Sequence, residues 1–543
     1  MGKHYNPGNE AFAEILRGDY VDKTGMIGLI NQVINTPDKL ICVSRPRRFG
    51  KSFAASMIGA YYDRSCDSHS LFQGYQISKL PGYEEHINQY NVISADITGF
   101  ISKVKKENGN LRDVPGMISN ELLNDLIRNE PALAYLRTAD PKPDLGDCLL
   151  SCVKETGKKF IFIIDEWDAL IREGKNDPEV QEAYLNFLRG LFKNRDITPY
   201  AIAAAYITGI LPVKKDGSQS AVSDFREYSM TDPGDFAPYV GFSEADVKDI
   251  CQKYAGDFEM MQKWYNGYTV GNERSVYNPY SVFSAIKNKG YRSYWRKTSA
   301  AEALLTYVDM DQDGLQEEIA HLISGESISI DTGSFQNDVE TFSCKDDVLT
   351  LLVHLGYLSF DSHYDNAYAE YEKRIVRIPN EEVRIEFDHM LRKATHEKLR
   401  ELVRTSDQLL ADTLAGQEDR VASAIDNISR TNYAPTYANG EQALRYLIKF
   451  AYISCVDQYM RIEELPSGHG IADVVFLPNR GSSLPAMIIE LKWDRSEEAA
   501  IRQIKGKDYP AVLNTYGGEI VLAGINYSTK TKEYTCKIER ICR

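Results

Sequence analysis

KLICVSRPRRFGKS, residues 39–52, joins two patterns that point to one kind of ligand. The apolar run 40–43 predicts a strand, and FAASMIGAYY at 53–62 predicts a helix, with GKS at 50–52 between them. A strand, a loop and a helix N-terminus form the setting of a phosphate-binding P-loop. The backbone N–H groups of such a loop and the positive end of the helix dipole favour an anion.

Within this loop, Lys51 would reach the β- and γ-phosphates of ATP, and the Ser52 hydroxyl would bind Mg²⁺. The rest of the predicted nucleotide-binding set on this stretch is Arg48, Phe49, Gly50 and Phe53. The pattern G-x-x-x-x-G-K-[ST] asks for Gly at position 45, where this chain has Arg45. The motif alone therefore leaves a second interpretation open, a basic strand–helix turn in which GKS occurs by chance.

A second motif follows a short buried strand at 92–98 and helical patterns over 111–156. The continuous apolar run 160–164 is typical of a central strand in a parallel sheet, and it ends in Asp165 and Glu166. Ligands of open α/β sheets bind at the carboxyl ends of the strands. Asp165 would hold Mg²⁺ through water, and Glu166 would activate the attacking water. Two adjacent carboxylates in a solvated turn are the alternative.

Strands and helices alternate through this half of the chain, because a helix is predicted at 177–193 and a third apolar strand at 200–209. This alternation favours a parallel sheet with right-handed crossovers. Thr208 lies at the tip of the last strand, where a polar side chain can contact the γ-phosphate or the water beside it.

Residues 224–300 are rich in aromatic side chains and in helical patterns, and they predict a helical lid over the nucleotide. Most of these aromatic residues are expected to form a packing layer. Arg226 is a candidate sensor of the γ-phosphate. Tyr20, Asp22 and Lys23 precede the loop, and they would either pack on the nucleotide base or form a turn.

The middle of the chain offers no clear ligand site. Asp309 begins a run like an EF-hand loop, but the twelfth position holds Ala320 instead of Glu, which excludes calcium. Residues 346–391 predict a helix followed by two strands, a winged-helix-like unit. Its helix lacks the basic side chains of a recognition helix, so we expect it to join domains. The Pro, Asn and Gly content of 430–442 indicates a linker.

Two further strands near the carboxyl terminus, at 472–477 and 486–492, carry a charged group. Asp473 opens the first strand, while Glu490 and Lys492 lie two apart on the second and share a face. Charges in such apolar strands are costly without partners. Hydrolysis of a phosphodiester explains the group, with Mg²⁺ on Asp473 and Glu490 and with Lys492 orienting or deprotonating the water.

Gln503 and Tyr509 on the following helix would support this second site or the DNA backbone. Glu463, which we place on the preceding helix at 440–460, would add a carboxylate. The alternative interpretation is a structural Glu–Lys pair on an edge strand, because D…ExK is a short pattern.

Bulk properties limit the classes of protein. A chain of 543 residues predicts about two to four domains. The net charge of −15 excludes an overall electrostatic footprint for nucleic acid but leaves room for a local basic groove. Nine scattered cysteines suit a reducing cytosol, and the adjacent-turn pair Cys148 and Cys152 is expected to be buried thiols. Without a signal peptide or an apolar run of roughly 18 residues, we expect a cytoplasmic protein.

With both sites in view, the chain resembles a bacterial family along nearly all of its length: AAA-ATPase-like proteins with a carboxyl-terminal PD-(D/E)XK nuclease-superfamily domain. The segments that carry the resemblance are RPRRFGKS (45–52), YVDKT (20–24), IIDEWD (163–168), YITGILPVKK (206–215), WYNGY (264–268), YNPYSV (277–282), SYW (293–295), RIPNEEVR (377–384), GIADVVF (470–476), IIELKWD (488–494) and AIRQIKGKDY (500–509). The family has Arg at position 45 of its loop, and it usually has Arg or Lys where this chain has Ile471.

The resemblance implies an α/β multidomain protein. It would have a P-loop AAA-ATPase-like core (1–223), a helical lid (224–300), a helical and winged-helix-like linker (301–430) and a nuclease-like α/β domain (431–543). ATP and Mg²⁺ are the implied cofactors, and DNA or another nucleic acid is the implied partner.

Two functions remain open at this point. In the first, ATP binding or hydrolysis gates a Mg²⁺-dependent nuclease that acts on DNA. In the second, a regulatory or signalling NTPase carries a carboxyl-terminal fold that binds nucleic acid or a partner without cleavage. The intact set Asp473, Glu490 and Lys492 favours the first. A homo-oligomer, and an arginine finger from a neighbouring subunit, stay open.

Overall fold

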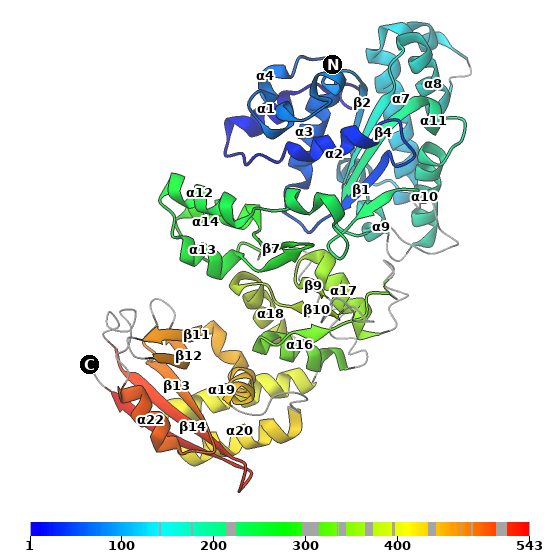
Figure 1. Cartoon of the computed structure of the whole chain (residues 1–543). Helices are drawn as coiled ribbons and strands as arrows, with labels where there is room; N and C mark the ends of the chain where they lie inside the picture. Colours follow the sequence, from blue (N-terminus) through cyan, green and yellow to red (C-terminus); the bar gives the residue numbers. More distant parts are fainter. Residues whose placement is uncertain are drawn as a thin grey trace. The chain divides into compact units, whose positions relative to one another are not determined.

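The computed structural model divides into two compact units, Met1–Arg292 with Ser329–Pro379 and Ser293–Ile328 with Asn380–Arg543. Figure 1 labels many of their elements. The structure describes residues 2–140, 143–174, 177–212, 224–295, 314–333, 335, 344–363, 373–393, 397–432, 441–467, 470–478, 482–506 and 518–541. The expected linker 301–430 is thus not one body, because its winged-helix-like part belongs to the first unit and its later helices belong to the second.

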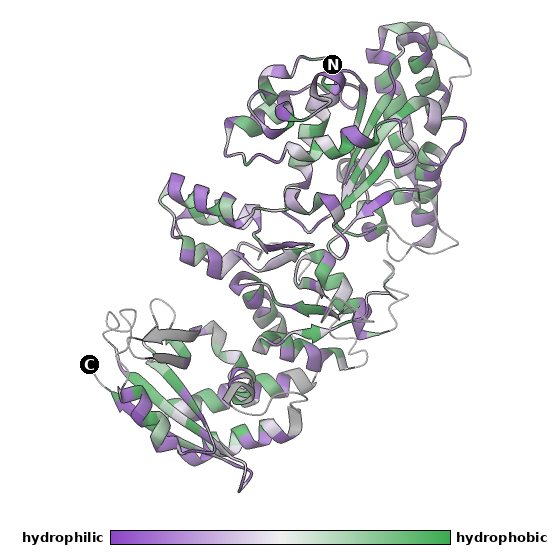
Figure 2. Cartoon of the chain, viewed as in Figure 1, coloured by the Kyte–Doolittle hydropathy of each residue, from purple (hydrophilic) through white to green (hydrophobic). Residues whose placement is uncertain are grey.

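A parallel sheet of five strands organises the first unit, in the order β2-β3-β4-β1-β5. The strands are β1 (Leu40–Ser44), β2 (Asn91–Asp96), β3 (Phe160–Asp165), β4 (Ile202–Gly209) and β5 (Arg226–Tyr228). The continuous apolar runs of the central strands are buried, and they stand out in Figure 2. The parallel sheet expected from the sequence is confirmed, whereas β5 joins it from a segment that we assigned to the lid.

Helices cover both faces of this sheet. Successive side chains of a strand point to opposite faces, so a continuous apolar strand must be buried on both. Phe160, Phe162 and Ile164 of β3 pack in one cluster with the face of α7 and α8, while Ile161 and Ile163 pack in the other with α3. The helices around the sheet are α1 (Glu10–Arg17), α2 (Gly25–Val33), α3 (Lys51–Tyr62), α4 (His69–Phe72), α5 (Tyr83–His86), α6 (Ile97–Lys106), α7 (Val114–Asn129), α8 (Leu145–Thr156), α9 (Ala169–Glu173), α10 (Pro178–Phe192) and α11 (Thr198–Ala201).

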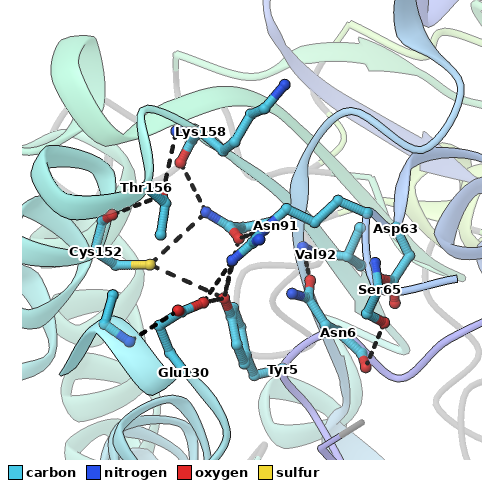
Figure 3. Close-up of polar contacts among 12 residues, drawn as sticks. Tyr5, Asn6, Asp63, Ser65, Asn91, Val92, Glu130, Cys152, Thr156 and Lys158 are labelled. Carbon is cyan, nitrogen blue, oxygen red and sulfur yellow. Dashed lines mark hydrogen bonds and ion pairs between the residues drawn. The ribbon is translucent and has the colours of Figure 1, made fainter. Parts of the chain in front are cut away.

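The amino-terminal segment is tied to β2 by a buried polar cluster (Figure 3). The Tyr5 hydroxyl donates to Glu130 Oε2 at 2.5 Å, and Arg64 Nη2 donates to the same carboxylate at 2.5 Å. The neighbouring Asn6 side chain accepts the Val92 N–H at 2.7 Å. These side chains satisfy one another inside the protein, which burial of polar groups demands.

The rest of the first unit consists of small helices and hairpins. The segment expected as a lid contains α12 (Glu244–Tyr254), α13 (Phe258–Tyr265), the hairpin β6 (Tyr268–Val270) and β7 (Glu273–Val276), and α14 (Pro279–Asn288). The expected helix and two strands of a winged-helix-like unit are present as α17 (Lys345–Leu355), β9 (Ser359–His363) and β10 (Lys373–Arg377), beside the short β8 (Ile328–Ser329).

The second unit holds a mixed sheet in the order β11-β12-β13-β14-β15, in which only β13 and β14 run parallel. Helix α22 (Glu497–Gly506) crosses between these two strands and packs on them through Ile501 and Ile504. The strands are β11 (Tyr459–Ser467), β12 (Gly470–Pro478), β13 (Ala486–Trp493), β14 (Ile520–Ser528) and β15 (Glu533–Ile541), and the other helices are α16 (Leu315–Ser324), α18 (Glu381–Lys393), α19 (Glu397–Leu414), α20 (Glu418–Asn432) and α21 (Glu441–Ala451).

Two predictions for this unit were wrong in detail. The helix expected at 440–460 ends at Ala451, and Glu463 lies on strand β11 instead of on a helix.

Across the described residues, no helix combines the length and the apolar character that a bilayer crossing requires.

Candidate nucleotide and metal sites

The P-loop sequence forms a tight connection between β1 and α3. Gly50 has φ of 85° and Arg48 has φ of 69°, and the helix begins at Lys51. A Cβ added to Gly50 would meet no heavy atom within 4 Å. The left-handed turn therefore brings the helix N-terminus round to the end of β1 and leaves room over the glycine.

Lys51 lies along the inside of this loop and is 7% exposed. Its Nζ donates to the carbonyl oxygens of Arg45 at 3.1 Å and Pro46 at 3.0 Å, and it lies 3.7 Å from Glu166 Oε1. Burial lowers the pKa of the Lys51 amine, and the carboxylate of Glu166 opposes that shift. A buried cation thus faces the acid pair at the end of β3.

Arg45, which stands where the general motif has Gly, leaves the loop unobstructed. Its guanidinium is buried, and Nη1 donates to the carbonyl oxygens of Ser44 at 2.8 Å and Tyr228 at 2.9 Å. The side chain therefore runs to the neighbouring strand β5, which explains why a long residue fits at this position.

Asp165 ends β3 in register with Asp96 of β2 and with Thr208 of β4. Burial raises the pKa of the Asp165 carboxyl group, and the nearby Ser52 hydroxyl opposes that shift. A hydroxyl beside a carboxylate at a helix N-terminus is the pair with which P-loop proteins hold Mg²⁺. The residues present therefore fit the metal that the motif implies.

Glu166 follows Asp165 with φ of 51°, an unusual left-handed conformation for a residue other than glycine. Its Oε2 accepts from Arg172 Nη2 at 2.7 Å, and Arg172 Nε donates to Asp168 Oδ2 at 2.9 Å. Both carboxylate oxygens of Glu166 therefore face a cation. Sequence reasoning missed Arg172 and Asp168, and the spacing of four between Asp168, which precedes helix α9, and Arg172 within it was a signal for the pair.

Thr208 does not lie as we expected. Its side chain is fully buried, and its hydroxyl donates to the Val43 carbonyl at 2.8 Å. The hydroxyl therefore serves the contact between β4 and β1 instead of facing the loop. Arg226 also departs from its predicted role, because it pairs in register with Ile41, well before β1 ends.

Asp22 and Lys23, in the segment ahead of the loop, contact other parts of the protein. Asp22 accepts the N–H of Thr24 at 2.9 Å and of Gln76 at 2.8 Å, while Lys23 pairs with Asp246 at 2.9 Å. These contacts occupy the polar atoms that we had considered for a nucleotide base.

Aromatic residues of the lid segment pack on the loop itself. Phe49 meets Tyr268 edge to face with ring centroids 5.2 Å apart, and the Arg48 guanidinium lies 4.3 Å from the Tyr280 ring centroid. Phe53 is 53% exposed, unusual for so large an apolar side chain. The loop is thus held from one side by aromatic contacts, as the packing-layer interpretation predicts for most of these residues.

The carboxyl-terminal charged residues come together on the second sheet. Lys492 Nζ lies 3.3 Å from Glu490 Oε1, and Gln503 of α22 hydrogen-bonds to the same oxygen. Asp473 of β12 accepts the Leu491 N–H at 2.9 Å, which places it beside the strand segment of Glu490. Glu490 is 1% exposed and Lys492 4%. These strands are central in the sheet, so the group is not a pair on an edge strand.

Arg445 of α21 adds a cation that the sequence did not single out, since α21 reads only as an amphipathic helix. Its Nη2 lies 2.8 Å from Asp473 Oδ1.

Two buried carboxylates, Asp473 and Glu490, supply the hard oxygen atoms that Mg²⁺ prefers, and Mg²⁺ commonly uses one or two carboxylates with water. The donor set therefore fits the implied ion.

Other expected members of this site are not placed by side chain. Tyr509 lies outside the described residues, and only the backbone is described for Glu463 and Ile471. Among the described residues, no group of three or more His, Cys, Asp and Glu side chains could hold a metal ion, so both candidate metal sites rest on smaller ligand sets. The described thiols Cys148 and Cys152 are buried and free, as expected.

Two solved structures are similar to parts of this chain. The ORC1 protein of Aeropyrum pernix in complex with DNA shares 10% identity, covers 72% of this chain and 97% of its own, and has a TM-score of 0.24. The ORC2 protein of the same organism, in ADPNP–ADP complexes, shares 12% identity, covers 68% and 96%, and has a TM-score of 0.28. Scores this low carry no argument about this chain.

A relative described as an uncharacterized protein in the vnfD 5′ region of Azotobacter chroococcum mcd 1 is 24% identical over 537 residues. The match covers 97% of this chain and 96% of the relative. Residues 7–218 match the family model described as predicted AAA-ATPase. The amino-terminal part of the chain therefore carries a predicted AAA-ATPase-like domain on a parallel sheet.

Proposed function

We propose that the first unit binds and hydrolyses ATP. The observation that carries this proposal is the meeting of Lys51, Ser52, Asp165 and Glu166 where β1 and β3 end and α3 begins. Their positions support a distinct role for each residue. Lys51 would pair with phosphate oxygens, and Ser52 and Asp165 would hold Mg²⁺. Glu166 would accept a proton from the attacking water.

Two substitutions test this assignment. Lys51→Ala is expected to abolish ATP binding, because it removes the buried amine that would pair with the phosphates. Glu166→Gln is expected to keep ATP binding and stop turnover, since an amide cannot accept the proton. Isothermal titration and a phosphate-release assay measure both quantities. The control is Glu173→Gln, a half-exposed acid on α9 paired with Lys105. Normal turnover in Glu166→Gln would remove the base from the proposal.

We further propose that the second unit is a Mg²⁺-dependent nuclease of the PD-(D/E)XK type that acts on DNA under control of the ATPase. The burial of Asp473, Glu490 and Lys492 in one group supports it, because such burial is costly unless the charges serve one another or a ligand. Asp473 and Glu490 would hold Mg²⁺, which when bound supplies charge stabilisation and a more acidic water.

The surrounding residues have separate tasks in this proposal. Gln503 and the Leu491 N–H fix the orientation of the two carboxylates. Lys492, whose Nζ also donates to the Leu491 carbonyl at 2.8 Å, holds or removes a proton of the attacking water and offers charge to the phosphate.

Plasmid and single-stranded DNA, incubated with the full chain with and without Mg²⁺ and ATP, test the nuclease. Cleavage should require Mg²⁺, disappear in Glu490→Gln and persist in Glu498→Gln, an exposed acid on α22. Loss of ATP-dependent cleavage in Lys51→Ala would support control by nucleotide. Intact ATP binding without cleavage under any divalent metal would favour the second candidate, a regulatory NTPase whose carboxyl-terminal fold binds nucleic acid or a partner.

A further inference from the structure

A continuous chain of charges connects the phosphate-binding loop to the segment after β4. Lys51 Nζ lies 3.7 Å from Glu166 Oε1, Glu166 Oε2 lies 2.7 Å from Arg172 Nη2, and Arg172 Nε lies 2.9 Å from Asp168 Oδ2. The proposed function uses Lys51 and Glu166 but assigns no role to the two residues beyond them.

Asp168 holds one end of this chain of charges in a fixed position. Its side chain is fully buried, and it accepts the N–H of Ile210 at 3.3 Å and of Leu211 at 3.0 Å as well as the Arg172 Nε. A buried carboxylate with three donors cannot turn away without leaving polar groups unsatisfied. Arg172 is therefore held in place at one end by the protein interior.

Glu166, at the other end, needs such support. Its left-handed backbone, with φ of 51°, is a conformation that persists only where the surroundings hold it. Its carboxylate is partly exposed, with 24% of the side-chain surface accessible. Arg172 hydrogen-bonds directly to this carboxylate, whereas Lys51 lies a full ångström further away.

We propose that Arg172 is a positioning residue of the ATPase site, which holds the Glu166 carboxylate toward the phosphate-binding loop by bridging it to buried Asp168. This inference rests on the proposed ATPase function. The planar guanidinium suits the task, because its fork donates to two carboxylates at once from a rigid geometry. A lysine carries the same charge but reaches one carboxylate as a point charge.

The test compares the full chain with Arg172→Gln and Arg172→Lys. Steady-state hydrolysis gives kcat and KM, and titration with ATP gives the affinity and the number of sites per chain. The matched control is Arg112→Gln, which removes a half-exposed arginine paired with Asp177 at 3.2 Å elsewhere in the same unit.

We expect kcat of Arg172→Gln to fall at least about tenfold, and by no more than the ~10²–10⁴-fold that a positioned general base contributes in all. The Kd for ATP and the number of sites should stay unchanged, and Arg172→Lys should recover part of kcat. Arg112→Gln should match the parent chain.

Three results would overturn the inference. They are an unchanged or raised kcat in Arg172→Gln, a loss of ATP sites that parallels the loss of kcat, and an Arg172→Lys variant no better than Arg172→Gln. A parent chain that binds no ATP, or binds it without turnover, would remove the proposed function itself. An active parent with a fully active Arg172→Gln would remove only the role of Arg172.

Discussion

Gly50→Ala distinguishes the effect of this glycine on stability from its effect on ATP binding, with Gly74→Ala as the matched control. Gly50 has φ of 85° and Gly74 has φ of 89°, and at both positions an added Cβ meets nothing within 4 Å. The left-handed conformation costs an alanine about 1–2 kcal/mol. Alanine also reduces the conformational entropy of the unfolded chain, which stabilises the folded protein by about 0.4–1 kcal/mol. Both variants should therefore lose roughly 1 kcal/mol of unfolding free energy, measured by urea denaturation.

ATP affinity should divide the two variants. A Cβ on Gly50 enters the space where the loop backbone would approach phosphate oxygens, so we expect the Kd for ATP to rise at least about tenfold, or about 1.4 kcal/mol. Gly74→Ala should bind ATP as the parent does. Equal affinity in the two variants, measured by isothermal titration, would contradict the placement of the phosphates over Gly50.

Three further substitutions follow from the structure. Tyr5→Phe removes a hydroxyl bonded to the buried Glu130 carboxylate, so unfolding free energy should fall by about 1.5–3 kcal/mol in urea denaturation. Burial, reinforced by a nearby arginine, lowers the pKa of His354 to about 3, so the unfolded chain alone takes up a proton between about pH 6.5 and 3. Stability should therefore fall on acidification through that range by up to about 1.4 kcal/mol per pH unit, and His354→Phe should lose this dependence. Arg445→Gln removes the cation paired with Asp473, so Mn²⁺ affinity measured by electron paramagnetic resonance should rise.

Each of these has a control and a contrary result. Tyr200→Phe, at a tyrosine 65% exposed, should leave stability unchanged, and equal losses in the two tyrosine variants would discount the buried cluster. Above about pH 6.5 the His354 variant should show no pH-dependent difference from the parent, and a difference there would point to another group. Arg430→Gln, at an exposed ion pair, should not alter Mn²⁺ binding. Weaker binding in Arg445→Gln would mean that the arginine orients Asp473 for the metal.

The sequence alone was sufficient to place β1, the P-loop, α3 and the acid pair after β3, because continuous apolar runs that end in polar residues are local signals. The same holds for Glu490 and Lys492, whose spacing of two puts both side chains on one face of β13 whatever surrounds the strand. These features depend on neighbours within a few residues.

Contacts between distant segments were beyond that reach. The Thr208 hydroxyl hydrogen-bonds to the Val43 carbonyl because the sheet order places β4 beside β1. Arg445 of helix α21 pairs with Asp473 of strand β12. The segment 301–430 was divided between two units, because its later helices pack with the second unit while α17, β9 and β10 pack with the first. Hydrophobic periodicity tells which face of an element is buried but not against which partner, so these pairings emerged only from the packing of the whole chain.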